Sequence, residues 1–140
     1  MSVPLSKRGE SELRVLTKSD ELAAYTIHIC SNEKHFPKRY RWCITAKIVD
    51  SSIDIVRYIK MANSLFINKD EEKFKLRLIY QDEAIASTYS LLAMIDIAYR
   101  TFSIESRRIE YWTGLIIEVQ TLLRNWQKVN KQQFEKYKLG

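Results

Sequence analysis

Residues that break regular secondary structure are scarce in this chain of 140 residues, which holds only three glycines and two prolines. An all-β protein needs turn residues every ~8–12 positions, so this composition excludes a β-sandwich or β-barrel. A chain of this length forms one domain that buries a sizeable core without disulfides or metal ions. We therefore expect a single all-α domain.

Cysteine pairs and long apolar runs are also missing. Cys30 and Cys43 form no CxxC motif and follow no secretory signal, which is typical of reduced thiols in a cytoplasmic protein. The most apolar stretch, Leu91 to Ala98, contains Asp96 and is far shorter than the ~18 residues that a membrane span needs. We expect a cytoplasmic protein that has no membrane partner.

Helical periodicity is the strongest pattern that the chain does have. Six apolar residues repeat at alternating spacings of three and four: Ile109, Trp112, Ile116, Val119, Leu123 and Trp126. This pattern is the seam of a long amphipathic helix, which must bury a continuous face against partner helices. The sequence therefore predicts a helical bundle.

Capping residues divide the chain into four helices. A first helix is predicted from Thr17 to about Asn32, and a second begins at Phe36-Pro37, because proline is tolerated in a first helical turn. A third is predicted over residues 70–102 and a fourth over residues 106–129. We expect an up-down-up-down four-helix bundle over residues 18–128, between a flexible arm (1–17) and a lysine-rich tail (129–140).

The second and third helices carry the remaining apolar stripes. The second stripe consists of Ile44, Ile48, Ser51, Ile55, Tyr58, Ala62 and Leu65, and it is widened by Val49, Ile53, Val56 and Ile59. Such a wide surface indicates a central helix or one that also faces another subunit. The predicted inner face of the third helix consists of Leu78, Ile85, Tyr89, Leu92, Ile95 and Tyr99.

Positive charge concentrates in two predicted connections. The net charge of +6 comes from 23 lysines and arginines against 17 acidic residues. In an up-down-up-down bundle the first and third connections lie at the same end, and together they carry Lys34, Lys38, Arg39, Arg41, Arg100, Arg107 and Arg108. His35, Tyr40 and Trp42 lie among these cations, and aromatic rings beside cations can stack nucleic-acid bases. The alternative is a merely solvated surface with Trp42 anchored in the core.

Catalytic and metal-binding patterns are weak. His28 and Cys30 point to different faces of a helix, so we expect no zinc site, two core-facing thiols and surface histidines. Asp96 is expected to be partly buried and paired with Arg100. The chain has no glycine-rich phosphate loop, HExxH or GxSxG motif. We therefore expect no cofactor, no bound metal and no enzymatic activity.

Two parts of the sequence look familiar. The run Tyr25-Thr26-Ile27 through Phe36-Pro37-Lys38-Arg39-Tyr40-Arg41, followed by Ile48-Val49-Asp50, resembles the opening of the Avd-like four-helix-bundle proteins. The segments from Tyr111-Trp112 to Leu122-Leu123 and Asn125-Trp126-Gln127-Lys128 are similar to the family's last helix. The family includes the accessory variability determinant of diversity-generating retroelements, and related proteins are encoded in ribosomal RNA intervening sequences.

This resemblance implies a homopentameric barrel of four-helix bundles that performs no catalysis. It also implies a basic surface that binds the retroelement reverse transcriptase and its RNA or cDNA. Two functions from different classes follow as hypotheses: a reverse-transcriptase accessory protein that binds nucleic acid, or an oligomeric protein-interaction scaffold with no polymerase partner. A bundle enzyme that uses Asp96, or the pair Asp50 and Asp54, is a third and weaker hypothesis.

Overall fold

The computed structural model describes residues 5–139, of which residues 5–8 are described by their backbone alone. This part of the chain contains four α helices and no strand: α1 (Leu5–Cys30), α2 (Ala46–Asn63), α3 (Glu71–Thr101) and α4 (Ser106–Leu139). A short 3₁₀ turn, η1 (Lys38–Tyr40), and a π-helical turn, η2 (Arg41–Thr45), precede α2. The expected all-α helical bundle is confirmed.

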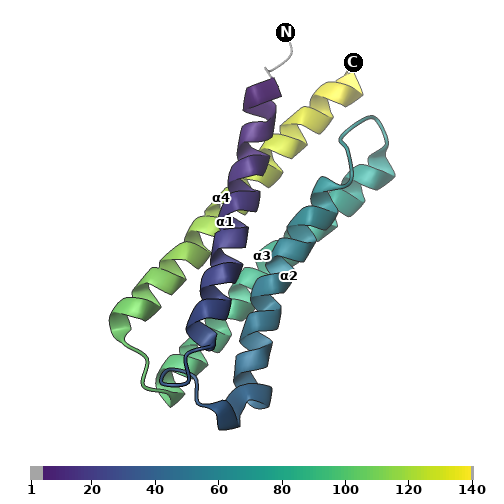
Figure 1. The fold of residues 1–140 in the computed structure, drawn as a ribbon. Coiled ribbons are helices and arrows are strands. Elements are labelled where there is room, and N and C mark those ends of the chain that lie inside the picture. Colours follow the sequence, from purple (N-terminus) through teal and green to yellow (C-terminus); the bar gives the residue numbers. More distant parts are fainter. Residues whose placement is uncertain (1–4, 140) are drawn as a thin grey trace.

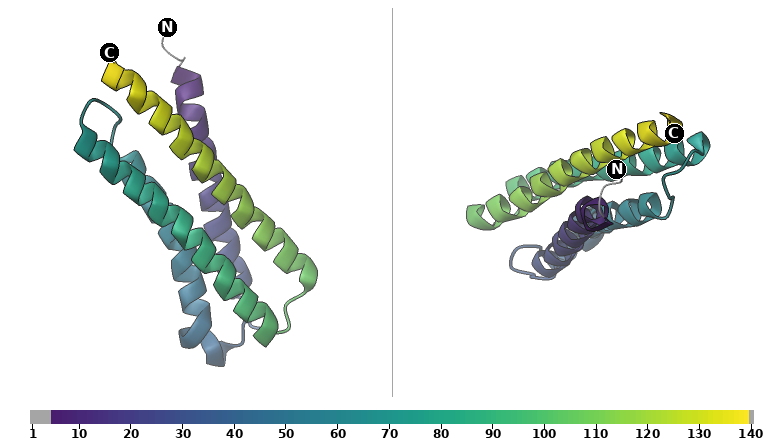
Figure 2. Two further views of the ribbon diagram at one scale, coloured as in Figure 1. Left: turned by 180° about the vertical axis from the view of Figure 1, so that it is seen from behind. Right: turned by 90° about the horizontal axis from the view of Figure 1, so that it is seen from above.

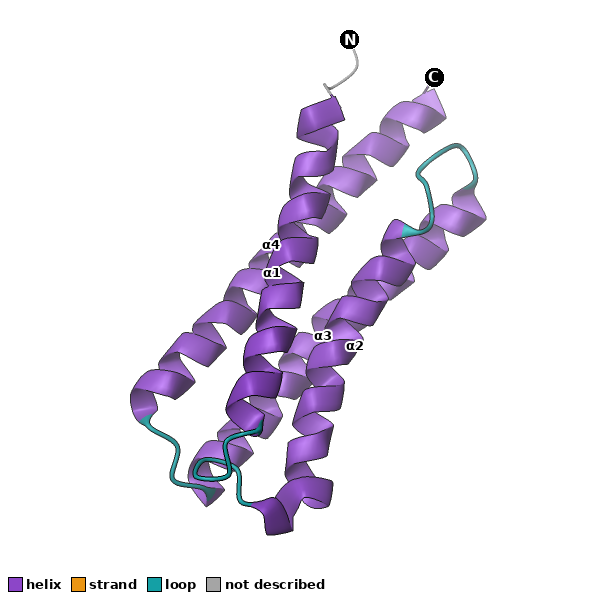
Figure 3. Cartoon of the chain, viewed as in Figure 1, coloured by secondary structure: helices purple, strands orange, loops and turns teal. Residues whose placement is uncertain are grey.

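The helices run alternately up and down along one long axis (Figure 1). The α1–α2 and α3–α4 connections lie together at one end, which we call the loop end (Figure 3). The α2–α3 connection, the N-terminal end of α1 and the C-terminal end of α4 lie at the opposite end, as the view from behind also shows (Figure 2, left). Both basic connections are therefore at the same end, as the topology predicted.

The core follows the predicted seam of α4. Trp112, Ile116, Val119, Leu123 and Trp126 are fully buried, and Ile109 is partly buried against the same cluster. The indole Nε1 of Trp112 donates a hydrogen bond of 3.0 Å to Thr26 Oγ1 on α1, so this buried polar atom has a partner. None of the described helices has the length and apolar character needed to cross a membrane.

The boundaries of α3 agree with the predicted ones. Asp70 is the N-cap, and its Oδ1 accepts a hydrogen bond of 3.2 Å from the N–H of Lys73. Phe102 ends the helix in an extended conformation. The predicted inner face of α3 was partly wrong, however, because Tyr89 is 54% exposed and Tyr99 is 41% exposed. The buried face instead includes the polar residues Arg77, Gln81 and Thr88.

Most of the apolar stripe on α2 is buried against other helices of the same chain. Ile48, Ile55, Ile59 and Ala62 are fully buried, and α2 packs against both α1 and α3. Of the residues that widen the stripe, Val49 packs against the core, and only Ile53 is exposed, at 37%. This helix is therefore central within its own bundle, which was one of the two explanations for its width.

Two segments that were expected to lie outside the bundle belong to it. Helix α1 begins at Leu5 and Val15 on it is fully buried, so the expected flexible arm is wrong from residue 5 onward. Residues 1–4 lie outside the described part. Helix α4 continues to Leu139, and Asn130 and Phe134 are buried in the segment that was assigned to a tail. The bundle therefore extends beyond residues 18–128 at both ends.

The end of α4 is fixed by an aromatic pair. The rings of Phe74 and Phe134 stack with centroids 4.1 Å apart and an interplanar angle of 5°. Replacing Phe134→Ala should lower the free energy of unfolding by about 3 kcal/mol, because it removes a buried aromatic side chain and leaves a cavity. Chemical denaturation measures this change. The control Lys136→Ala alters an exposed residue on the same helix, and an equal, small effect of both variants would contradict the packed position of Phe134.

Candidate nucleic-acid interface

The two basic connections touch through aromatic side chains. The ring of Tyr40 in η1 lies 5.2 Å from the ring of Phe102 at the end of α3. Phe36 lies 5.6 Å from Phe102 and 6.0 Å from Trp112, both with edge-to-face geometry. Such pairs bury large apolar areas in preferred geometries. This aromatic cluster holds the α1–α2 connection against the α3–α4 connection.

The structure brings all seven predicted cations to the loop end. Lys34 follows α1, while Lys38 and Arg39 lie in η1 and Arg41 begins η2. Arg100 lies in the last turn of α3, and Arg107 and Arg108 lie in the first turn of α4. Six of these residues are exposed, and Arg108 is partly buried.

The three arginines around the α3–α4 connection are close to carboxylates. Arg100 Nε lies 3.2 Å from Asp96 Oδ2, so the predicted pair is confirmed, although Asp96 is exposed rather than partly buried. Glu105 lies 3.8 Å from Arg107 and 3.7 Å from Arg108. These are weak surface pairs, but they reduce the positive charge available to a ligand.

Arg108 also faces the interior of the bundle. Burial raises the pKa of Tyr25 on α1, and the nearby Arg108 guanidinium opposes this shift. The ring of Tyr25 in turn contacts Tyr111 edge to face, with centroids 4.9 Å apart. Arg108 is therefore the least available of the seven cations.

The four cations of the α1–α2 connection form the candidate interface proper. Lys34, Lys38, Arg39 and Arg41 make no ion pair with any residue in the described part of the chain. The guanidinium carbon of Arg39 lies 5.0 Å from the centroid of the Tyr40 ring, a cation–π arrangement that orients this side chain. Glu33 is the one acidic residue between Ser31 and Thr45.

The aromatic and histidine residues of this connection are divided between surface and core. Trp42 is 81% exposed, so the alternative that anchors it in the core is wrong. His35 is buried and cannot contribute to the surface. Tyr40 is partly buried against Phe102. The exposed ring beside the cations is therefore that of Trp42.

The cysteines and the carboxylate Asp54, considered above as reactive groups, lie in different environments. Cys30 is buried, and this burial raises the pKa of its thiol to about 12; Cys43 is exposed, contrary to the expectation of two core-facing thiols. Asp54 pairs with Arg57 at 2.8 Å on the same helix. Within residues 5–139 no three His, Cys, Asp or Glu side chains are grouped as metal ligands would be.

A buried arginine at the opposite end was missed by sequence reasoning. Arg77 on α3 is only 2% exposed. Its Nη1 donates to the carbonyl oxygens of Ala62 and Leu65, at 3.0 and 2.6 Å, at the C-terminal end of α2. Its Nε donates to Asn130 Oδ1 on α4 at 2.8 Å, and its Nη2 pairs with Glu12 Oε1 on α1 at 3.0 Å.

Arg77 thereby connects all four helices. Its guanidinium also lies 5.0 Å from the centroid of the Trp126 ring, and Gln81 Nε2 donates to the same Asn130 oxygen at 2.8 Å. Burial lowers the pKa of Arg77, and the Glu12 carboxylate opposes this shift. A positive charge at the end of α2 also complements the helix dipole and satisfies carbonyl groups that have no partner within the helix.

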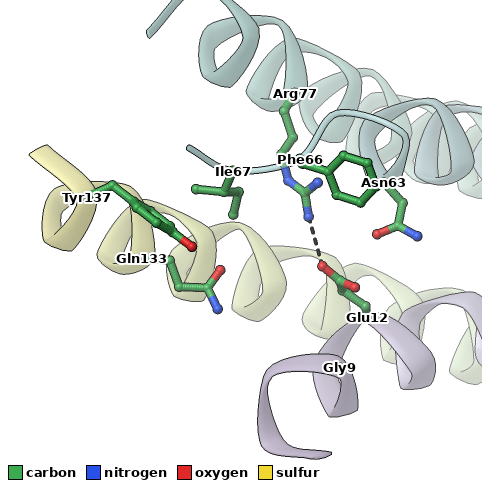
Figure 4. A pocket seen from close by; sticks show the side chains of 8 residues that line it. All are labelled: Gly9, Glu12, Asn63, Phe66, Ile67, Arg77, Gln133 and Tyr137. Carbon is green, nitrogen blue, oxygen red and sulfur yellow. Dashed lines mark hydrogen bonds and ion pairs between the residues drawn. The ribbon is translucent and has the colours of Figure 1, made fainter. Parts of the chain in front are cut away.

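A hollow of about 380 Å³ lies beside Arg77 (Figure 4). Its lining consists of Gly9, Glu12, Asn63, Phe66, Ile67, Arg77, Gln133 and Tyr137. Each guanidinium nitrogen of Arg77 donates to a protein acceptor, so this group contributes to the hydrogen bonding that joins the helices. No protein-family model, curated protein or solved structure matches the chain.

The structural role of Arg77 can be measured. Replacing Arg77→Met should lower the free energy of unfolding by about 3 kcal/mol, because the carbonyl groups of Ala62 and Leu65 and the side chain of Asn130 each lose a hydrogen bond from the guanidinium. Glu12→Gln keeps an acceptor oxygen near Arg77 but removes the carboxylate charge paired with it, and it should cost less than Arg77→Met. Denaturation curves give both values. RNA affinity measured where Arg77→Met is still folded should equal that of the unchanged protein; a selective loss of binding would assign Arg77 to a ligand site instead.

Proposed function

We propose that this protein is a non-enzymatic accessory factor that binds nucleic acid at its loop end. The observation that carries the proposal is the surface of Lys34, Lys38, Arg39 and Arg41, whose charges are not neutralised by described carboxylates. Phosphate groups bind such surfaces by releasing their counterions. A net charge of +6 favours the same class of partner over the whole molecule.

The partner enzyme in this proposal is the reverse transcriptase of a diversity-generating retroelement. Support comes from the sequence resemblance to the Avd-like proteins, which covers roughly residues 18 to 128. The helical bundle is the fold that this resemblance implies. The first resembling run extends from α1 through the basic connection into α2, and the second lies in α4. The protein would hold RNA or cDNA near the polymerase without catalysing a reaction itself.

Charge reversal tests the proposed surface. The triple variant Lys38→Glu, Arg39→Glu, Arg41→Glu should weaken binding of a single-stranded RNA at least about ten-fold at physiological salt. The slope of log K against log salt should become shallower by about 2, since each lost phosphate contact contributes about 0.7 for a single strand. Fluorescence anisotropy with labelled RNA measures both quantities.

A matched control lies at the opposite end of the bundle. Lys69, Lys73 and Lys75 are exposed near the start of α3, and their reversal to glutamate changes the net charge by the same amount. This control should keep most of the affinity. If both triple variants bind equally well, or lose affinity equally, the loop end is not the interface.

We further propose that the chain assembles as a homopentamer. The resemblance implies this assembly, and an apolar groove of about 490 Å³ is consistent with a covered surface; it lies between the end of α3 and the segment from η1 to the start of α2. Ile97, which is 53% exposed, lines this groove together with Ile44, Met94 and Phe102. A protein-interaction scaffold without a polymerase partner would use the same kind of surface.

Light scattering coupled to size-exclusion chromatography tests the assembly. The expected particle mass is five times the chain mass of 16.6 kDa. Ile97→Glu places a charge in the groove and should reduce the particle mass, whereas Ile79→Glu, at an exposed position on the same helix, should not. A monodisperse monomer would contradict both the pentamer and the oligomeric scaffold.

A further inference from the structure

Trp42 differs from the other two tryptophans of the chain. Trp112 and Trp126 are fully buried in the core, whereas 81% of Trp42 is accessible to solvent. A large aromatic ring that stays exposed to water contributes no burial energy to the stability of the fold. Its exposed position beside the unpaired cations therefore indicates a role in binding a ligand.

The backbone holds this ring away from the core. Trp42 is the second residue of η2, the π-helical turn Arg41–Thr45, none of whose residues is buried. η2 is continuous with α2, and the N–H of Ala46 donates back to the carbonyl of Arg41. Single π-helical turns are rare in proteins, and those that occur are often found at functional sites. The indole is thus presented on a regular helical backbone, so little conformational entropy is lost when it binds a ligand.

The surroundings of the indole combine apolar walls with charge. A hollow of about 320 Å³ beside it is lined by Ile27, Cys30 and Val49, among others, with Arg41 and Asp50 also in its lining. Arg41 is adjacent in sequence, and Lys38 and Arg39 lie in the turn that precedes η2. Within the hollow the charges of Arg41 and Asp50 are equal in number, and Lys38 and Arg39 add positive charge in the preceding turn.

We infer that Trp42 is a stacking platform for an unpaired nucleobase, with Lys38, Arg39 and Arg41 neutralising the adjoining phosphates. This inference rests on the proposed function and specifies the substrate class as single-stranded nucleic acid. In a duplex the faces of the bases stack on one another and are not available to an indole, while in a single strand every base offers a π face. A protruding ring among cations is the arrangement that single-strand binding proteins use.

Substitution of Trp42 separates stacking from charge attraction. Trp42→Ala should weaken binding of a short fluorescein-labelled single-stranded RNA about ten-fold, the lower range of one lost base–aromatic stack. It should leave the salt slope unchanged, since no phosphate contact is removed. Trp42→Phe keeps an aromatic face and should restore most of the affinity. Binding of a blunt RNA duplex of the same length should be weaker and insensitive to both changes.

Intrinsic fluorescence gives a second readout on the unmodified protein. Because Trp112 and Trp126 are buried, quenching by an unlabelled single strand should come from Trp42, and it should disappear in Trp42→Phe. Equal losses of single-strand and duplex binding in Trp42→Ala, or unchanged single-strand binding, would overturn the inference. If Trp42→Ala lowers the particle mass without changing RNA binding, Trp42 belongs to a contact between protein chains and the inference is also overturned.

The outcomes also distinguish this inference from the proposed function. If reversal of Lys38, Arg39 and Arg41 abolishes binding while Trp42→Ala does not weaken it, the stacking platform is wrong and the basic interface remains. If neither variant alters RNA binding, both are wrong.

Discussion

The buried guanidinium of Arg77 is the interaction on which the arrangement of the helices depends. It pairs with Glu12 on α1, bonds to carbonyl groups at the end of α2, projects from α3 and bonds to Asn130 on α4. A buried arginine is costly unless its donors have acceptors. The helix register that brings these acceptors to Arg77 is therefore strongly favoured over registers in which a helix is shifted along its axis. The hydrogen-bonding geometry sets the relative height of all four helices at one end of the bundle.

Aromatic packing joins the two connections at the loop end. The rings of Phe36, Tyr40 and Phe102 meet there and join the two connections. Between the two ends, the seam of α4 supplies a continuous apolar core. Rigid helices that are fixed at both ends hold short connections in defined positions, which is the condition for a binding surface built on loops. The candidate interface thus depends on contacts that lie both within it and far from it.

The sequence was sufficient to predict those features that depend on a single local physical signal. The caps of α3 at Asp70 and Phe102 and the seam of α4 were predicted from local chemistry and periodicity. The buried polar face of α3 was not, because a charged residue such as Arg77 becomes favourable inside only when partners far away in sequence converge on it. The cations of the loop end were found by charge and topology. The position of Trp42 was left open between a ring beside the cations and a core anchor, since composition alone does not separate the two.

Hydrogen–deuterium exchange of the whole protein with and without a saturating single-stranded RNA tests the central claim most directly, because it locates the bound surface without any substitution. A loop-end interface predicts slower exchange in the α1–α2 connection, from Lys34 to Cys43, with a smaller effect from Arg100 to Arg108. The α2–α3 connection and the last turns of α4 should exchange at unchanged rates. Slower exchange at that opposite end, with none in the α1–α2 connection, would contradict the account.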